Sequence, residues 1–461
     1  MDHEDLRHWS HRAADWAADY HATLCDRPVR AGTERGSVRA ALPAEAPEAP
    51  EPMEAIWADF ERLVPANMTH WQHPRFFAYF PANAAPASML AEQVANAMAA
   101  QCMLWQTSPA ATEIEEAMVG WLARALGLGE GFAGTIHDSA TTATLSAVLT
   151  MRERALDWAG NAKGLSGQPA IRIYASDQTH SSVDKAARIA GIGQANLVKV
   201  PTDTTGAMDP AQLRAAITAD RAGGMLPAGV VICAGGTSVG AFDRVGEIVA
   251  MARAAGLMTH VDAAWAGSAM ICPEFRHLWA GVEGADSIVF NPHKWLGAQF
   301  DCSVQFLADP GPQVRTLGLR PHYLQTPGQE EIVNFNEWTV PLGRRFRALK
   351  LWFLLRAEGL EALRTRIRNH VTWAEEAAAT LAALPGIKVT STPALGLFSF
   401  ALTAGDEATE ALLTRLNADG RVYLTQTNHR GRYVIRVSVG GWATTRQDVM
   451  LLTDLVREFS T

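Results

Sequence analysis

Short apolar runs alternate with amphipathic stretches between about residues 110 and 310. Most residues in these runs are β-branched or otherwise apolar, and the segments between them have helical spacing. The runs are IRIYAS at 171, ANLVKV at 195, GVVICAG at 229, LMTHVDA at 257, DSIVFN at 286 and CSVQFL at 302. This alternation is typical of a largely parallel sheet with helices on both faces. The sequence therefore predicts the α/β fold class for this region.

The segments on either side of this region have different patterns. Apolar residues recur every three or four positions from Leu6 to Tyr20, and a Pro-rich stretch separates this predicted helix from a second one at 53–64. After about residue 345, a long helical region leads into the strand patterns GLFSFAL and RYVIRVSVG. We expect an N-terminal helical arm (1–82), a large α/β domain (83–350) and a small C-terminal α+β domain (351–461). The arm has little core of its own, so we expect it to pack on a second subunit.

Composition and charge exclude several kinds of partner. Apolar residues make up 48% of the 461 residues and charged residues 19%, as in a large globular protein. A net charge of −8 provides no basic field for nucleic acid or anionic membranes. The longest uncharged runs, 93–112 and 222–242, are interrupted by Gln and Asn or by Gly and Pro, so no membrane span is predicted. The acidic N-terminus and five widely spaced cysteines favour a cytoplasmic protein with reduced thiols and without a metal site.

Two short motifs point to other classes of protein. G-x-G-x-x-G at 129–134 follows a helical run, whereas the dinucleotide fingerprint follows a strand. G-x-S-x-G at 236–240 does follow a strand, so a serine hydrolase with Ser238, an acid such as Asp286 and a histidine is the rival hypothesis. Several residues nevertheless separate Ser238 from the next helical pattern, unlike a nucleophile elbow.

Polar side chains stand where four of the predicted strands end. They are His180, Thr237, Asp262, Asn291, His293 and Lys294. Each one alone has an ordinary structural explanation, as a helix cap, a core imidazole or a surface amine. Parallel strands, however, end at one edge of a sheet, where α/β proteins bind ligands. Ser139, Ala140 and Thr141 precede a helical stretch, and the N-terminus of a helix can hold a phosphate.

Because lysine is scarce in this chain, few residues could supply an amine for covalent chemistry. The chain has six lysines, and among them Lys294 alone stands at a strand end beside other polar groups. A lysine near a carboxylate, an imidazole and a phosphate cradle matches the parts of pyridoxal phosphate. These parts are an aldehyde that forms a Schiff base, a pyridine nitrogen, a ring face and a phosphate. The sequence therefore predicts a pyridoxal-phosphate enzyme.

Several longer segments resemble the group II pyridoxal-phosphate decarboxylases, most closely the aromatic-L-amino-acid decarboxylases. They are HVDAAWAGSAMICPEFRHL at 260, DSIVFNPHKWL at 286, DQTHSSVDKA at 177, HPRFFAYFPAN at 73, LWQTSPAATEIE at 104 and VPLGRRFRALKLWF at 340. The resemblance covers nearly the whole chain in order. It implies the aspartate-aminotransferase fold (fold type I), a homodimer with shared active sites, and an arm that wraps the partner subunit.

The resemblance also implies roles for individual residues. Lys294 would carry the cofactor as a Schiff base, Asp262 would pair with the pyridine nitrogen, and His180 would stack on the ring and approach the substrate carboxylate. The remaining cofactor contacts would come from Ala140, Thr141, Thr237, Asn291 and His293, with Ala140, Thr141 and Asn291 at the phosphate and Thr237 near the 3-hydroxyl group. A carboxylate at the ring nitrogen keeps that nitrogen protonated, so the ring can accept electrons when carbon dioxide leaves.

The segment 317–331 resembles the mobile catalytic loop of that family. Its Tyr323 matches the tyrosine that returns a proton to the substrate's α-carbon, a general-acid role. Members with Phe at this position resemble aldehyde synthases, so Tyr323 favours decarboxylation to an amine. An aldehyde synthase, or a decarboxylase of another amino acid, is the alternative.

The resemblance places a wall for an aromatic substrate on both sides of the site. The matching residues are Tyr79, Phe80, Pro81, Ala82, Gln101, Met103, Trp105, His180 and Gly343. Met103 and Trp105 are expected to reach in from the neighbouring subunit. Gly343 leaves room for a large ring, such as that of Dopa, 5-hydroxytryptophan or tryptophan, with tyrosine and phenylalanine as smaller candidates. Ala82, Gln101, Met103 and Trp265 depart from the family pattern, so the preferred amino acid stays open.

Overall fold

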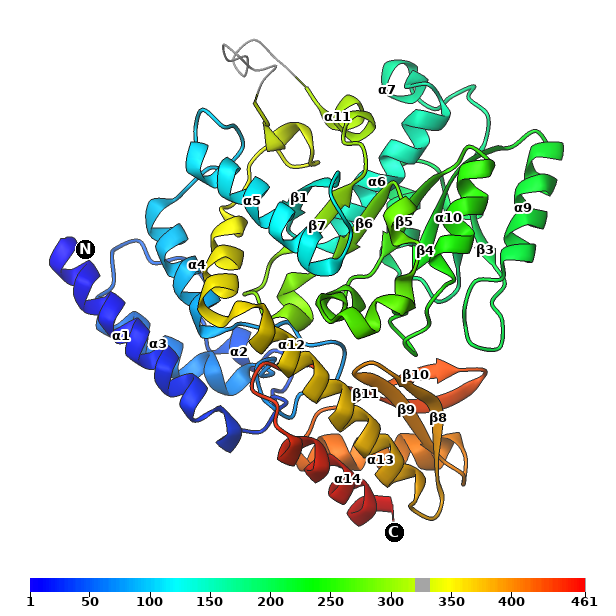
Figure 1. Cartoon of the computed structure of the whole chain (residues 1–461). Helices are drawn as coiled ribbons and strands as arrows, with labels where there is room; N and C mark the ends of the chain where they lie inside the picture. Colours follow the sequence, from blue (N-terminus) through cyan, green and yellow to red (C-terminus); the bar gives the residue numbers. More distant parts are fainter. Residues whose placement is uncertain (320–331, 461) are drawn as a thin grey trace.

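A seven-stranded β-sheet with helices on both faces forms the centre of the molecule (Figure 1). The computed structural model describes residues 1–319 and 332–460. In spatial order the strands are β1 (Ala133–His137), β7 (Ser303–Leu307), β6 (Ser287–Phe290), β5 (Met258–Asp262), β4 (Leu226–Cys233), β2 (Ile171–Ser176) and β3 (Leu197–Val200). β7 is antiparallel to both neighbours and the other pairs are parallel. The predicted α/β class is confirmed, and all six apolar runs form strands.

Alternating side chains on these strands face two apolar cores. In β2, Ile173 belongs to the core on one face of the sheet and Tyr174 to the core on the other. The first core lies under α6 (Ala140–Ala155), α7 (Ala159–Lys163) and α8 (Ser182–Ile189). The second lies under α5 (Pro109–Leu126), α9 (Pro210–Ala222), α10 (Val245–Ala254) and the start of α12 (Arg347–Ala382). Burial on both faces explains why these strands are nearly continuous apolar runs.

The carboxyl ends of β2, β4, β5 and β6 meet at one edge of this sheet. Cys233, which ends β4, pairs with Asp262, which ends β5. α6 starts at the same edge, because β1 leads into it through a short turn. Ser139 caps this helix with its hydroxyl, which accepts a hydrogen bond from the Thr142 amide at 3.3 Å. The edge therefore combines strand ends with the N-terminus of a helix.

A four-stranded antiparallel sheet forms the C-terminal part of the chain. Its order is β10 (Thr425–His429), β11 (Arg432–Ser438), β9 (Leu397–Leu402) and β8 (Ile387–Ala394). The second half of α12, together with α13 (Asp406–Asp419) and α14 (Arg446–Ser460), covers one face of it and encloses a separate apolar core. α12 connects the two sheets and bends at Gly359, where φ is +71°. The two sheets fall within the predicted ranges 83–350 and 351–461, and the boundaries themselves stay a prediction.

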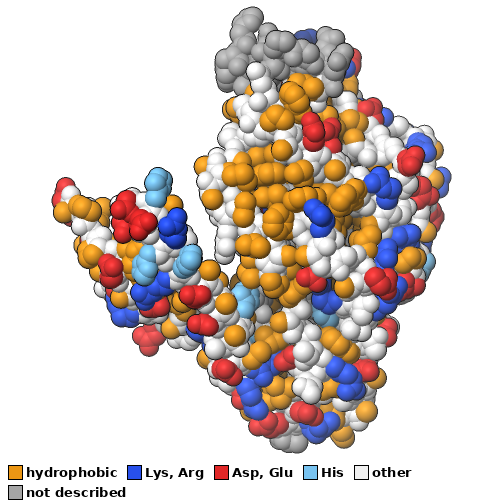
Figure 2. All heavy atoms as spheres, turned by 60° about the vertical axis from the view of Figure 1, so that its left-hand side comes forward, with side chains coloured by type: hydrophobic (Ala, Val, Ile, Leu, Met, Phe, Trp, Pro, Cys, Tyr) orange, Lys and Arg blue, Asp and Glu red, His pale blue; other side chains and the backbone are white. Residues whose placement is uncertain are grey.

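Two helices at the N-terminus form an arm with an aromatic seam. α1 (His3–Ala22) packs on α3 (Met53–Leu63), with ring centroids 5.6 Å apart for Trp9 and Trp57 and 4.9 Å apart for Trp16 and Phe60. α2 (Ser37–Ala40) lies between them in sequence, and α4 (Pro86–Met98) and α11 (Gly311–Leu317) complete the described α-helices. Figure 2 shows the arm standing away from the body of the molecule.

Cys25 is exposed and the other four cysteines are buried, and all five are free. Within residues 1–319 and 332–460, no helix combines the length and the apolar character needed to cross a bilayer.

Candidate active site

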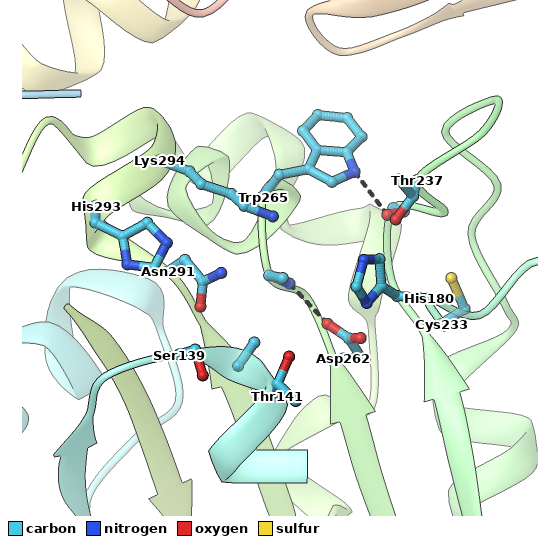
Figure 3. A pocket seen from close by; sticks show the side chains of 13 residues that line it. Ser139, Thr141, His180, Cys233, Thr237, Asp262, Trp265, Asn291, His293 and Lys294 are labelled. Atoms are coloured by element: carbon cyan, nitrogen blue, oxygen red, sulfur yellow. Dashed lines mark hydrogen bonds between the residues drawn. The ribbon is translucent and has the colours of Figure 1, made fainter. Parts of the chain in front are cut away.

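A cavity lies at the edge where the four strands end (Figure 3). Its lining residues are Ser139, Ala140, Thr141, His180, Cys233, Gly235, Thr237, Asp262, Ala264, Trp265, Asn291, His293 and Lys294. All eight residues that the sequence assigned to the cofactor are in this set. The structure thus brings together side chains from β2, β4, β5, β6 and α6, as expected for strand ends that share one edge.

Lys294 projects its amine into this cavity from η7, a short π-helical turn (Pro292–Leu296). Its backbone is fixed by the Asn291 carbonyl, which accepts from the Lys294 amide at 2.9 Å, and by Asn83, whose Nδ2 donates to the Lys294 carbonyl at 2.7 Å. Burial lowers the pKa of Lys294, Asp262 acts against this shift, and the nearby Arg436 adds to it. A lysine with a lowered pKa exposes the neutral amine that attacks an aldehyde.

Asp262, which ends β5, and His180, which follows β2, point into the same cavity (Figure 3). Asp262 is buried, and its Oδ1 accepts from the Ala264 amide at 3.0 Å. His180 Nδ1 accepts from the Ser182 amide at 3.1 Å, so the neutral ring carries its proton on Nε2. Burial lowers the pKa of His180, and Asp262 opposes that shift. The site therefore pairs a buried carboxylate with a neutral imidazole.

The opposite end of the cavity suits an anion. The first turn of α6, with Ala140 and Thr141, opens onto it, and helix N-termini carry unpaired N–H groups. Asn291 is fixed beside this turn, because its Oδ1 accepts from Ser303 Oγ at 2.5 Å. His293 Nδ1 accepts from the Cys302 amide at 3.0 Å, and burial lowers the pKa of His293 to about 3. His293 is therefore a neutral positioning group.

The donor set fits pyridoxal phosphate. Among the described residues, no partner contacts Lys294 Nζ or the second oxygen of Asp262, and both groups face the cavity. The amine suits the aldehyde, the carboxylate suits the pyridine nitrogen, and the first turn of α6 suits the phosphate. His180 lines the same cavity and can cover the ring face. Each part of the cofactor thus has a matching group.

A larger cavity of about 780 Å³ adjoins the first one and shares Lys294 with it. Tyr79, Phe80 and Ala82 line it, as the sequence predicted, whereas Pro81 is buried beside them and does not. The Phe80 ring stacks on Trp265 with centroids 4.8 Å apart. Trp265 lines both cavities and donates from Nε1 to the Gly235 carbonyl at 2.6 Å. One wall of the site is therefore aromatic.

The other predicted substrate residues form a second group. Gln101, Met103, Trp105 and Gly343 line neither cavity that contains Lys294. Gln101 and Gly343 lie close to each other, because Gln101 Oε1 accepts from the Arg344 amide at 2.7 Å and a Cβ on Gly343 would lie 3.0 Å from the Gln101 side chain. Tyr323 lies outside the described residues.

The hydrolase hypothesis fails on geometry. Ser238 follows β4 at the active edge, but α10 begins only at Val245, so there is no nucleophile elbow. Asp286 precedes β6 and accepts from the Thr259 amide and hydroxyl at 2.8 Å, at the opposite edge of the sheet. The proposed acid therefore cannot reach Ser238. The glycines at 129–134 precede or lie in β1 and do not follow a strand.

Several residues of the site were not predicted from the sequence. They are Asn83, Trp71, Gln72, Cys233, Gly235, Phe300, the β10 residues Thr425, Gln426 and Thr427, and Arg436. The sequence pattern could have identified Arg436, because it is the one charged residue inside the apolar part of RYVIRVSVG. The others have ordinary local patterns that do not distinguish them.

The fold and the donor set together define a pyridoxal-phosphate enzyme of fold type I. The family model "Pyridoxal-dependent decarboxylase conserved domain" matches residues 36–403. The chain belongs to this family of pyridoxal-phosphate-dependent decarboxylases.

Known relatives match over nearly their whole length. The aromatic-L-amino-acid decarboxylase of Rattus norvegicus is 36% identical over 100% of this chain and 98% of its own length. The phenylacetaldehyde synthase of Arabidopsis thaliana is 35% identical over 99% and 96%. The crystal structure of Oryza sativa TDC with pyridoxal phosphate and tryptamine superposes with a TM-score of 0.96 at 34% identity, over 100% of this chain and 98% of that one. The predicted family, fold type and cofactor are confirmed.

Proposed function

We propose that this chain removes the carboxyl group of an aromatic L-amino acid and releases the corresponding amine and carbon dioxide. The observation that carries this proposal is the position of Lys294 between two cavities. One cavity has the donor set for the cofactor, and the other has the aromatic wall of Phe80 and Tyr79. The relatives named for aromatic amino acids support the same substrate class.

Each polar group of the site has a separate task. Bound pyridoxal phosphate supplies an electron sink for the pair of electrons left behind when carbon dioxide departs. Lys294 would hold the cofactor at its aldehyde through a neutral amine. Asp262 holds a proton on the pyridine nitrogen. His180 covers the ring and directs its Nε2 proton towards the substrate carboxylate.

The proton that replaces the carboxyl group comes from Tyr323. A phenol positioned at the α-carbon acts as a general acid after carbon dioxide has left. Burial of Phe80 and Trp265 beside the reacting atoms excludes water from one side of the site. Exclusion of water strengthens the electrostatic contacts of Asp262 and His180.

We infer a cytoplasmic homodimer with shared sites as the working form. On α4, Leu90, Val94 and Met98 are spaced by one helical turn, and about half of each side chain is exposed. Figure 2 shows hydrophobic side chains gathered on the face beside the arm. A second copy that covers this face would bring Gln101, Met103, Trp105 and Gly343 towards the partner's cavity. The free cysteines are consistent with a reducing compartment.

A carbon dioxide release assay on the purified holoenzyme tests the activity. It uses the common L-amino acids together with Dopa and 5-hydroxytryptophan. We expect release from aromatic substrates, and Lys294→Ala abolishes both this release and the yellow colour of the cofactor-loaded protein. Lys388→Ala, a change in β8 at a residue that lines neither cavity, leaves both unchanged. Absence of carbon dioxide from every aromatic substrate would refute the proposal.

The aldehyde synthase is a second candidate, because one relative carries that name. The two activities differ in products, since the synthase consumes oxygen and releases ammonia and aldehyde. With Tyr323 intact we expect amine without ammonia, and Tyr323→Phe shifts the product towards aldehyde and ammonia. Quantifying amine, aldehyde and ammonia from one reaction checks both statements. An unchanged amine yield in Tyr323→Phe would remove Tyr323 from the mechanism.

A further inference from the structure

Side chains from distant parts of the chain hold η7, the turn that carries Lys294. The carbonyl groups of Lys294, Trp295 and Leu296 follow one another at the end of this turn, where a helical segment leaves its carbonyls without intrahelical partners. Asn83 donates to the first of the three. Arg366 Nη2 donates to the other two, at 3.3 Å to Trp295 and at 2.7 Å to Leu296. The position of the turn therefore depends on residues outside it.

His370 contacts the same turn through a side chain. The Trp295 indole is fully buried, and its Nε1 donates to His370 Nδ1 at 2.9 Å. Arg366 and His370 are four residues apart on α12, so they lie on one face of this helix. One face of α12 thus contacts both the backbone and the side chain of the residue that follows Lys294.

The charges at this contact keep both groups in the protonation state that the bonds require. Burial and the Arg366 cation lower the pKa of His370 to about 3, so at neutral pH Nδ1 is free of a proton and accepts. Burial lowers the pKa of Arg366 to about 9, and Glu358 opposes this shift, so the guanidinium is charged at neutral pH. Arg366 forms no ion pair within residues 1–319 and 332–460. Its Cζ instead lies 3.5 Å from the centroid of the Trp442 ring, a cation–π contact.

We propose that Arg366 and His370 are positioning residues for Lys294, an inference that rests on the proposed role of Lys294 as the lysine that binds the cofactor. They act through Trp295, whose carbonyl and indole they hold together. A lysine amine forms a Schiff base with an aldehyde, with loss of water, only where the two groups meet in the correct geometry. Because α12 connects the two sheets, the connecting helix sets the position of the reacting amine.

The test compares two forms of the cofactor on the whole chain after hydroxylamine has removed the bound cofactor. Pyridoxal phosphate carries the aldehyde that bonds to Lys294. Pyridoxamine phosphate has the same ring and phosphate with an amine in place of the aldehyde, so it binds without the covalent bond. Calorimetry measures both dissociation constants. We expect Arg366→Gln and His370→Leu to weaken pyridoxal phosphate by at least about tenfold and pyridoxamine phosphate by less than about twofold.

Conservative variants and a matched control separate positioning from folding. Arg366→Lys keeps a charged donor, and His370→Asn keeps an acceptor near the place of Nδ1, so both recover part of the affinity for pyridoxal phosphate. Arg368→Gln removes an arginine of the same helix that pairs with Glu274 and Glu361, and it leaves both dissociation constants unchanged. If His370→Leu yields no folded protein, Arg366→Gln decides the test. Equal weakening of the two compounds, or no weakening of pyridoxal phosphate, would overturn the proposal.

Lys294→Ala separates the positioning role from the role of Lys294 itself. We expect this variant to lose the covalent share of pyridoxal phosphate binding, so that Arg366→Gln added to it changes neither dissociation constant further. If Lys294→Ala binds pyridoxal phosphate as tightly as the wild type, Lys294 does not bind the cofactor and the proposed role beneath this inference is wrong. If Lys294→Ala weakens pyridoxal phosphate and Arg366→Gln does not, the positioning role alone is wrong.

Discussion

Asn83 connects the lysine of the active site to the segment that follows β11 through three side-chain hydrogen bonds. Its Nδ2 donates to the carbonyls of Lys294 at 2.7 Å and Gly440 at 2.8 Å, and its Oδ1 accepts from the Trp442 amide at 2.7 Å. The Asn83 amide also donates to the His293 carbonyl at 2.7 Å. Asn83 is 1% exposed, so water does not replace these bonds readily. We predict that Asn83→Ala loosens the turn that carries Lys294.

The size of the effect follows from the three groups that lose their partner. A buried N–H or C=O group left unpaired costs about 1–3 kcal/mol, so the lower end of that range gives about 3 kcal/mol for the three together. The lost bonds also free the Lys294 backbone, and a displacement of about 1 Å at a reacting group lowers a rate by roughly 100-fold. We therefore expect a large fall in kcat together with a clear loss of stability.

Urea unfolding of the holoenzyme, followed by tryptophan fluorescence, measures the loss of stability. Carbon dioxide release measures the fall in kcat. Asn417→Ala is the matched control. Asn417 also bridges backbone groups, with bonds of 3.0 Å and 2.9 Å to Leu424, but it lies on α13 among the small-domain elements. The control variant loses stability and keeps kcat within about twofold of the wild type. Equal kcat values for Asn83→Ala and the wild type would refute the positioning role of Asn83.

Two further predictions concern stability. Burial lowers the pKa of five histidines to about 3 or 4, below the unfolded value of about 6.5. Their stabilising contribution is therefore complete above pH 6.5 and is lost as the pH falls towards 4. These residues are His73, His137, His260, His293 and His370. Each should cost about 2 kcal/mol at pH 5, and equal urea midpoints at pH 7 and pH 5 would contradict this. Glu115→Gln leaves Arg344 without its buried partner at 2.6 Å and should cost about 3–5 kcal/mol. Asp454→Asn, which breaks an exposed pair, should cost less than about 1 kcal/mol, and equal costs for the two variants would contradict the reasoning.

The central strands could be predicted from the sequence because both of their faces are buried. Such strands need apolar residues at nearly every position, and a short apolar run is visible in one sequence. β1, β8 and β10 were not predicted, and each lies at the edge of its sheet. β10 has the sequence TQTNH, and β1 begins just after a Gly-rich turn. Pairing with a neighbouring strand stabilises these segments, and that pairing leaves no apolar period in the sequence.

The residues assigned to the cofactor could be grouped from the sequence for a topological reason. Parallel strands end at one edge, so polar residues that follow apolar runs are brought together without knowledge of the loops. Arg436 and Asn83 do not follow this rule. Arg436 comes from an antiparallel sheet, and Asn83 from the segment before α4, so only the packing of separate units places them near Lys294. The residues assigned to the cofactor could therefore be grouped from local patterns, whereas the lining of the larger cavity depends on tertiary packing.

The predicted substrate residues that line neither cavity favour a site shared between two subunits, because their segment is held firmly in place. These residues are Gln101, Met103, Trp105 and Gly343. Gln101 is bonded to the backbone of Arg344. The Arg344 side chain is buried and donates to Glu115 Oε1, Thr135 Oγ1 and the Ile136 carbonyl. A movement of this group towards the Lys294 of its own chain would break that buried ion pair, and a broken buried pair costs about 3–5 kcal/mol. A second copy that covers the apolar stripe of α4 could instead receive Gln101 and Met103 at its own cavity without any such rearrangement. This cost supports the proposed homodimer over a rearrangement within one chain.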